Sequence, residues 1–196
     1  MVTYSKTDSA AGNCLSMGYN YKTFVSEEQY FMVLKTLQRL RECDFFWSTM
    51  TGKQASVLLS PHMPGTFLVR ESSDNQHLFT LSVKTQTGTK NLRIQCDEKS
   101  FFLQTDPKNV EHVPHFDCVL KLINYYIRQR NSSTVYYIRA GGERIPLELI
   151  KPLYLSMSSL QHLCRKKINK DLDISSQRDQ LPSTVQDYLN KYDVDI

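Results

Sequence analysis

The chain has 196 residues, of which 40% are apolar, and a formal net charge of +4. This suffices for one hydrophobic core with a smaller appendage, while no apolar run approaches the roughly 20 residues of a membrane-spanning helix and so mild a charge does not by itself indicate nucleic acid. The five cysteines lack the close spacing of a zinc site, and the first residues lack the apolar stretch of a signal peptide. We therefore expect a cytoplasmic protein without disulfides, metal or other cofactor, and without membrane insertion.

The composition of residues 1–25 is typical of a flexible arm. Three aromatic residues nevertheless lie close together in this arm, namely Tyr19, Tyr21 and Phe24. They indicate a binding function for the arm, and the structural alternative is that Phe24 simply packs where the following helix begins.

Residues 26–42 carry the signals of an amphipathic helix. Ser26 and Gln29 form a capping box, and Val25 is placed to pack on Tyr30 as a hydrophobic staple. Helical spacing of apolar residues predicts one buried face, made of Tyr30, Val33, Leu34, Leu37 and Leu40.

The pattern then changes to strands. Residues 65–71 (GTFLVRE) form an apolar run, 78–84 (LFTLSVK) alternate in polarity, and 90–96 (KNLRIQC) return after the turn TQTGT. A short strand, SFFLQ, and a second helix, HFDCVLKLINYYI, follow, with VYYIRAGGERIPLEL expected as loop and short strand. This order predicts an α+β fold in which two helices flank a central antiparallel sheet.

The last residues, 151–196, are helical again. The segments SSLQHLCRKKINKDLD and LPSTVQDYLNKY have amphipathic spacing, the second with apolar residues at Val185, Tyr188, Leu189 and Tyr192. Short helices of this total length bury too little core to be stable alone, so we expect them to pack on the main domain, on a partner, or on both.

An arginine lies within the most apolar predicted strand. Arg70 follows the apolar residues 67–69 and shares a strand face with Leu68. A guanidinium next to a core is costly without a partner, because it does not lose its charge. The partner is either a carboxylate of this chain, Glu71 or Asp74, or a ligand.

Further hydrogen-bond donors accompany this arginine. Ser72 and Ser73 follow it in a loop, and Arg93 lies on the polar face of a strand expected to be nearby. Such donors suit a phosphate group, which carries a charge of about −1.5 to −2 and three strong acceptor oxygens, and arginine binds phosphate bidentately. The alternative for Arg93 is an ordinary strand arginine that faces solvent.

The stretch WSTMTGKQASVLLS…GTFLVRESS resembles an SH2 domain. In that family a tryptophan opens the domain, a helix follows, and the FLVRES strand supplies the arginine that binds phosphotyrosine. The matching residues are Trp47, Gly65, Phe67, Leu68, Val69, Arg70, Glu71 and Ser72. The resemblance covers roughly residues 43–150 and implies that Arg70, Ser72, Ser73 and Arg93 bind the phosphate.

Hydrolysis of phosphotyrosine is the alternative chemistry. Tyrosine phosphatases need a cysteine nucleophile followed six residues later by an arginine. In this chain the sixth residue after each cysteine is never an arginine; these positions hold Asn20, Thr49, Phe102, Asn124 and Lys170. The sequence therefore favours a binding protein and not an enzyme.

The pattern SLQHLCRKKI in the tail resembles the SOCS box of the suppressor of cytokine signalling family. In that family the box follows an SH2 domain, and its first helix docks on elongin C, which is bound to elongin B. The resemblance implies that this surface consists of Leu160, Leu163, Cys164 and Ile168. The alternative is an ordinary core stripe in a small helical subdomain.

Two further features of the tail bear on its partners. The family carries a cullin-binding segment of the form Leu-Pro-apolar-Pro, and here Leu181 and Pro182 match while the second proline is missing. The resemblance therefore implies cullin 5 as a partner, bound more weakly than usual. The basic run of Arg165, Lys166, Lys167 and Lys170 is expected to be a solvated helix face and not a nucleic-acid site.

The segment 19–30, YNYKTFVSEEQY, resembles the kinase inhibitory region of two members of the same family. The resemblance implies that Tyr21, Lys22, Thr23 and Phe24 enter the substrate groove of a Janus kinase, with Phe24 as the apolar anchor. A tyrosine at position 21 replaces an aliphatic residue of the related arm, so the segment is expected to be a slow substrate or a product-like inhibitor.

Together these resemblances predict a feedback inhibitor of cytokine signalling that performs no catalysis. Its SH2 domain would bind phosphotyrosine on a receptor tail or kinase, its arm would block the Janus kinase, and its SOCS box would recruit an elongin–cullin ubiquitin ligase. The alternative is a phosphotyrosine adaptor whose tail helices only complete the fold, and a basic nucleic-acid module is a third, less favoured, possibility.

Overall fold

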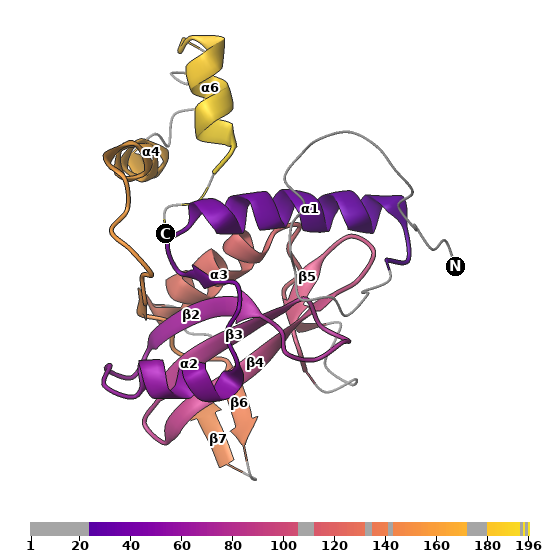
Figure 1. Cartoon of the computed structure of the whole chain (residues 1–196), viewed down its shortest axis with the longest axis vertical. Helices are drawn as coiled ribbons and strands as arrows, with labels where there is room; N and C mark the ends of the chain where they lie inside the picture. Colours follow the sequence, from indigo (N-terminus) through magenta and orange to yellow (C-terminus); the bar gives the residue numbers. More distant parts are fainter. Residues whose placement is uncertain are drawn as a thin grey trace.

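The computed structural model describes residues 24–105, 112–131, 135–140, 143–171, 180–192, 194 and 196. The fold is α+β, as the sequence predicts: a central sheet, mainly antiparallel, is flanked by helices (Figure 1). Of the residues expected to contact a kinase, Tyr21, Lys22 and Thr23 lie outside the described residues, and Phe24 lies within them.

Helix α1, Glu27–Glu42, begins as predicted, with two differences. The Ser26 side chain accepts a hydrogen bond from the Gln29 amide at 3.1 Å, but the Gln29 side chain accepts from the Val25 amide instead of closing the box on Ser26. The staple is formed by Phe24, whose ring meets Tyr30 edge-on at 5.3 Å between centroids, while Val25 is exposed. The predicted staple was therefore shifted by one residue.

The sheet has the strand order β1-β2-β3-β4-β5, with β8 also pairing with β2. Its strands are β1 Phe46–Trp47, β2 Thr66–Glu71, β3 Phe79–Thr85, β4 Gly88–Cys96, β5 Phe101–Leu103 and β8 Lys151–Pro152. The strands β1 and β8 run parallel to β2 and were not predicted, because two residues are too few to show a period. A separate hairpin, β6 Tyr137–Ala140 with β7 Glu143–Pro146, replaces the expected loop and short strand.

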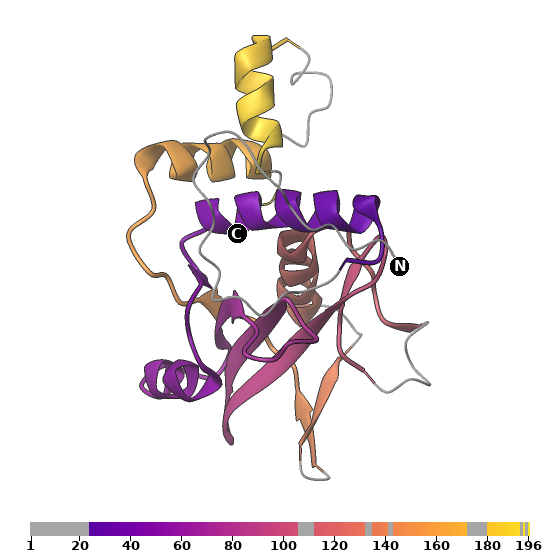
Figure 2. The same ribbon diagram turned by 45° about the vertical axis from the view of Figure 1, so that its right-hand side comes forward.

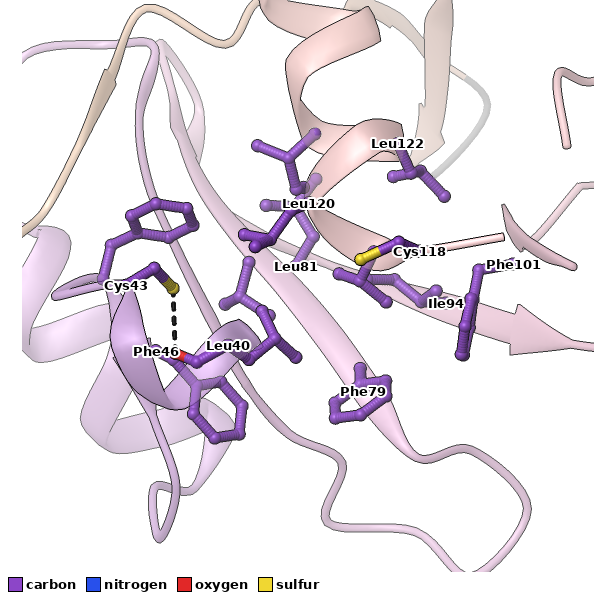
Figure 3. Packing of buried hydrophobic residues seen from close by; sticks show 14 of the residues in the cluster. Leu40, Cys43, Phe46, Phe79, Leu81, Ile94, Phe101, Cys118, Leu120 and Leu122 are labelled. Atoms are coloured by element: carbon purple, nitrogen blue, oxygen red, sulfur yellow. Dashed lines mark hydrogen bonds between the residues drawn. The ribbon is translucent and has the colours of Figure 1, made fainter. Parts of the chain in front are cut away.

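Apolar side chains cover both faces of β2. Phe67 and Val69 belong to the main core with α1 and α3, whereas Leu68 packs with Ala55 and Leu59 of helix α2, Gly52–Leu59, on the other face. Figure 3 shows the main core, in which the Cys43 thiol donates to the Leu40 carbonyl at 3.0 Å. Burial raises the pKa of this thiol to about 12, so Cys43 is a neutral core residue.

The second predicted helix begins later than its periodicity suggests. Helix α3 is Val119–Arg128, followed by a short 3₁₀ turn at Gln129–Asn131. Phe116, which lies within the segment HFDCVLKLINYYI expected as helix, exchanges two backbone hydrogen bonds with Phe101 at the end of the sheet. Sheet pairing over a long sequence separation thus overrides helical periodicity at this position.

Helices α4, Leu160–Asp171, and α6, Ser183–Asn190, lie on the far side of α1 from the sheet (Figure 2). The residues after α6 return to the main core, where Tyr192 is fully buried and Val194 nearly so. Of the alternatives expected for the tail, namely packing on the main domain, on a partner or on both, the structure shows contact with the main domain.

One expectation about the tail was wrong. Arg165 was assigned to a solvated basic face, yet only 2% of its surface is exposed. It forms an ion pair with Glu42 of α1 at 2.7 Å, and its guanidinium lies 4.7 and 4.9 Å from the ring centres of Tyr188 and Tyr192. These partners are distant in sequence, so helical spacing within α4 could not identify them.

Candidate functional site

The side chain of Arg70 points away from the main core, toward the face of the sheet that α2 covers. Only 4% of its surface is exposed. The guanidinium donates to Ser82 Oγ at 3.1 Å, Met50 O at 3.3 Å, Glu71 O at 2.9 Å, Ser73 Oγ at 3.2 Å and Asn91 Oδ1 at 3.4 Å. All five acceptors are neutral oxygens.

This set of partners tests the alternative of a salt bridge within the chain. Among the described residues, no carboxylate lies within salt-bridge distance of its guanidinium, so the expected alternative of a salt bridge with Glu71 or Asp74 is wrong. Burial lowers the pKa of Arg70, and the nearby charge of Asp74 offsets this only in part. Because arginine stays charged at any physiological pH, a buried positive charge is left without an anion in direct contact.

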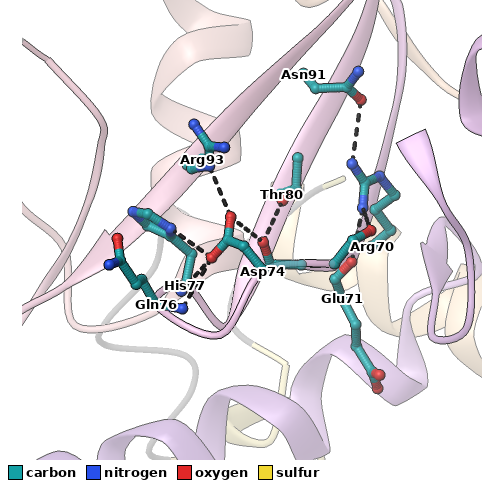
Figure 4. Close-up of polar contacts among 10 residues, drawn as sticks. Arg70, Glu71, Asp74, Gln76, His77, Thr80, Asn91 and Arg93 are labelled. Carbon is teal, nitrogen blue, oxygen red and sulfur yellow. Dashed lines mark hydrogen bonds and ion pairs between the residues drawn. The ribbon is translucent and has the colours of Figure 1, made fainter. Parts of the chain in front are cut away.

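The sheet register brings the second arginine to the same face. Arg70 of β2 lies opposite Thr80 of β3, and Thr80 lies opposite Arg93 of β4. Directly opposite residues of antiparallel strands project to the same side, so these side chains form a row across three strands (Figure 4). Ser82 and Asn91 form the next row and hydrogen-bond each other at 2.7 Å.

The loop after β2 supplies the hydroxyl groups and a carboxylate, Asp74, which pairs with Arg93 and not with Arg70. Asp74 accepts from Arg93 Nε at 2.7 Å, from the backbone amides of Gln76 and His77, and from the His77 ring (Figure 4). Partial burial raises the pKa of Asp74, but the hydrogen bonds from Arg93 and His77 outweigh this and hold it well below its usual range. Arg93 is half-exposed and paired with Asp74, not simply solvated.

These side chains surround a cavity of about 340 Å³, which we call the Arg70 pocket. Its lining consists of Gly52, Arg70, Ser72, Ser73, Asp74, Thr80, Asn91 and Arg93. A Cβ on Gly52 would lie 3.3 Å from Arg70 Nη2, so the glycine at the start of α2 leaves room for the guanidinium. All four residues expected to bind phosphate are therefore brought together.

Sequence reasoning missed four lining residues, namely Gly52, Asp74 as a partner of Arg93, Thr80 and Asn91. A signal for two of them was present. Thr80 alternates with the apolar residues of its strand, and Asn91 shares the polar face predicted for Arg93. Only the register between strands, however, reveals that these residues meet at Arg70.

A second cavity, of about 420 Å³, adjoins the first, and we call it the tyrosine pocket. It shares Asn91 and Arg93 with the Arg70 pocket. Its remaining lining includes Leu103, Tyr126, Tyr136, Tyr137, Ile138 and Leu147. The hydroxyl groups of Tyr125 and Tyr136 hydrogen-bond each other at 2.8 Å and join α3 to the segment before β6.

The residues of the predicted elongin surface are exposed on α4. Leu160 is 77% exposed and Leu163 48%, and both Cys164 and Ile168 are also exposed. This is the opposite of a core stripe, so the alternative reading of a subdomain core is not supported. Of the predicted cullin residues, Leu181 is half-buried and Pro182 is exposed as the N-cap of α6.

Two other kinds of site were sought in the described part of the chain. No group of three or more His, Cys, Asp or Glu side chains there could hold a metal ion. No helix there is long and apolar enough to cross a membrane.

A buried arginine at the centre of an antiparallel sheet, with serine hydroxyl groups beside it, is the arrangement that the sequence resemblance led us to expect, and an SH2 domain family model matches residues 45–126. The chain is therefore an SH2-domain protein. It is 48% identical over 206 residues to Suppressor of cytokine signaling 3 of Gallus gallus and 42% identical over 222 residues to the Homo sapiens protein of that name, in both cases covering 98% of this chain and 99% of the relative. It is 37% identical over 158 residues to Suppressor of cytokine signaling 2 of Homo sapiens, covering 81% of this chain and 79% of the relative. The chain belongs to the suppressor of cytokine signalling family, which confirms the resemblance inferred from its sequence.

Proposed function

We propose that this protein restrains cytokine signalling from the cytoplasm by binding phosphotyrosine, on a receptor tail or a Janus kinase, in the Arg70 pocket. The observation that carries the proposal is the burial of Arg70 among neutral acceptors only. A phosphate would supply the missing negative charge, and its oxygens would accept from Arg70, Ser72, Ser73 and Arg93. Charge-assisted bonds of this kind are about twice as strong as neutral ones.

The two adjoining pockets support an extended peptide as the ligand. A peptide whose phosphotyrosine occupies the Arg70 pocket would cross Asn91 and Arg93, the residues that both pockets share. A later side chain would then reach the tyrosine pocket, where Leu103, Ile138 and the tyrosine rings offer apolar contacts within a lining that also contains polar groups. We therefore expect selectivity for an apolar residue after the phosphotyrosine.

Titration calorimetry with a phosphotyrosine peptide from a cytokine receptor, and with its unphosphorylated twin, tests the binding proposal. Arg70→Met keeps the apolar stem but removes the charge, and we expect it to weaken binding at least about a hundredfold. Arg41→Met is the matched control, because Arg41 is exposed on α1, away from the pocket. Equal binding by the Arg70 variant, or equal binding of the unphosphorylated peptide, would contradict the proposal.

We further propose that residues 151–196 form a SOCS box that recruits elongin C, with elongin B, through α4. The exposed apolar side chains of Leu160, Leu163 and Ile168 support this, since exposed apolar residues at helical spacing are typical of a helix that docks in a groove. Leu181 and Pro182 would bind cullin 5. The captured protein would then be ubiquitinated by the partner enzymes.

Co-purification with elongin B/C separates this proposal from the alternative of a plain phosphotyrosine adaptor. We expect Leu160→Asp to abolish co-purification without affecting the fold, because Leu160 is 77% exposed. Met157→Asp is the control, since Met157 is 97% exposed but lies before the helix. Wild-type protein that captures no elongin would favour the adaptor.

For the N-terminal arm we propose inhibition of a Janus kinase by Tyr21, Lys22, Thr23 and Phe24. Phe24 is half-buried against Tyr30, as the structural alternative requires, so its ring would have to leave α1 to enter a kinase groove. Kinase assays with Phe24→Ala test this, and mass spectrometry of Tyr21 decides between a slow substrate and a product-like inhibitor. Undiminished inhibition by the Phe24 variant would show that Phe24 packs against Tyr30 without contributing to kinase inhibition.

A further inference from the structure

The carboxylate of Asp74 makes two different kinds of contact with its two oxygens. Oδ1 accepts from the backbone amides of Gln76 at 3.0 Å and His77 at 2.8 Å, and from the His77 ring at 2.8 Å. Oδ1 therefore closes the loop after β2. Oδ2 instead faces the Arg70 pocket, where it accepts from Arg93 Nε at 2.7 Å and Ser72 Oγ at 3.2 Å.

Oδ2 thus occupies donors on two of the four residues proposed to bind phosphate. A phosphate that uses the Nε edge of Arg93 for a bidentate bond, or the Ser72 hydroxyl, needs these same donors, and one N–H or O–H does not donate at full strength to two anions. This ion pair is accessible to an incoming anion, since 32% of the Asp74 side chain and 50% of the Arg93 side chain are exposed to water. Arrival of the phosphate is accordingly an exchange of one anion for another.

We propose that Asp74 is an internal competitor that occupies the phosphate donors of Arg93 and Ser72 until phosphotyrosine displaces it, which lowers the affinity of the SH2 domain for its ligand. This inference rests on the proposed function of the Arg70 pocket. Its cause is geometric: one carboxylate oxygen lies where a phosphate oxygen would lie. The low pKa of Asp74 agrees with it, because the competitor remains ionised throughout the physiological range.

The variant Asp74→Asn isolates the competing oxygen. Asparagine keeps Oδ1 for the loop amides, while its amide nitrogen replaces Oδ2 and no longer accepts from Arg93. Asp97→Asn is a matched control, because Asp97 Oδ1 accepts from the amides of Lys99 and Ser100 in the same way and lies outside the pocket. Asp74→Ser is a second uncharged variant, with a short side-chain oxygen that can still accept from the loop amides.

Binding of the phosphotyrosine peptide is measured by calorimetry for these variants, for Arg93→Met and for the double variant Asp74→Asn, Arg93→Met. We expect Asp74→Asn to bind about two- to fivefold more tightly than wild type, the scale of one exposed ion pair. Asp97→Asn should bind like wild type. In the Arg93→Met background the gain should largely vanish, because the contested cation is absent.

Unchanged or weaker binding by folded Asp74→Asn, or by Asp74→Ser if the asparagine variant does not fold, would overturn the inference. A gain that persists in full without Arg93 would also overturn it, since simple charge repulsion would then explain the effect. Arg70→Met, measured in the same series, distinguishes failure of the proposed phosphate binding from failure of the proposed competition by Asp74. If it loses binding while the Asp74 variants match wild type, the binding function stands and the competitor does not.

Discussion

Among the described residues, Arg70 and Arg165 are the two most deeply buried arginines, ahead of Arg39, and their surroundings differ. Arg165, 2% exposed, contacts the carboxylate of Glu42, the rings of Tyr188 and Tyr192, and His162 Nδ1. Arg70, 4% exposed, contacts only neutral oxygens, and the nearest acid partner in its pocket, Asp74, hydrogen-bonds to Arg93 instead.

The difference supports the proposal that Arg165 is structural and that Arg70 binds a ligand. Arg165 has an anion from its own chain, and it joins α4 and α6 to the C-terminal end of α1. Arg70 bears the cost of burial without that compensation. Burial alone therefore does not reveal the role of a charged residue, whereas the charge of its partners does.

The largest expected difference between the two arginines is in the free energy of unfolding when each is replaced by methionine. We expect Arg165→Met to lower the free energy of unfolding by about 2–4 kcal/mol, because it leaves Glu42 unpaired and removes two cation–π contacts. For Arg70→Met we expect a change within about 1 kcal/mol, since relief from a buried charge offsets the lost neutral hydrogen bonds. Urea unfolding of both variants without ligand measures the difference.

The double variant with Glu42→Gln is the control for Arg165. If the ion pair matters, the two single effects will not add, because Glu42 and Arg165 contact each other at 2.7 Å. Equal destabilisation by the two methionine variants would contradict the distinction between a structural and a ligand-binding arginine.

A smaller effect is expected when pH is lowered. Burial first, and the charges of Arg165 and Lys166 next, lower the pKa of His162 below its ordinary 6.5, against a weaker opposite influence of Asp44 and Glu42. The unfolded chain therefore takes up the proton more readily, so stability is complete above pH 6.5 and decreases as pH falls below it. We expect this slope in urea unfolding between pH 7 and 5, and we expect His162→Asn to flatten it.

Asparagine is chosen because its Oδ1 can still accept from Arg165, as His162 Nδ1 does at 2.9 Å. The low pKa values of Asp74 and Asp97 act only in more acidic solution, because their stabilisation is present above the ordinary carboxyl pKa of 3.8 and is lost as pH falls below it. An identical slope in the His162 variant would show that the histidine is not the responsible group.

The smallest effect is expected from Gly52→Ala. The new Cβ would lie 3.3 Å from Arg70 Nη2, tight enough to shift the guanidinium slightly within the pocket. We expect peptide affinity to fall about threefold and stability to rise by up to about 1 kcal/mol, because alanine is the better helix residue. Lys53→Ala, at an exposed neighbouring position, is the control, and tighter binding by the Gly52 variant would contradict the steric explanation.

Much of the fold could be predicted because its signals are local. Helical spacing identified α1, alternation identified β3 and β4, and the apolar run identified β2. Elements of two residues, β1 and β8, could not be predicted, because their pairing with β2 joins segments far apart in the chain. Phe116 was misassigned for the same reason, since its backbone partner is Phe101.

The candidate site, like the fold, was predicted only in part from the sequence. The apolar strand and its motif were enough to select Arg70, Ser72 and Ser73 from the sequence, and the polar face of the strand KNLRIQC added Arg93. The row that Thr80 completes depends on strand register, and the capture of Arg93 by Asp74 depends on how the loop folds over β4.

By itself, then, the sequence determined the family, the fold class and the four residues proposed to bind phosphate, because periodicity and motifs are properties of neighbouring residues. Only the tertiary structure decided which buried charge has a partner. In the folded chain Arg165 pairs with Glu42, Asp74 pairs with Arg93, and Arg70 contacts neutral acceptors. The physical reason is that the free energy of a buried charge depends on the groups that surround it in space.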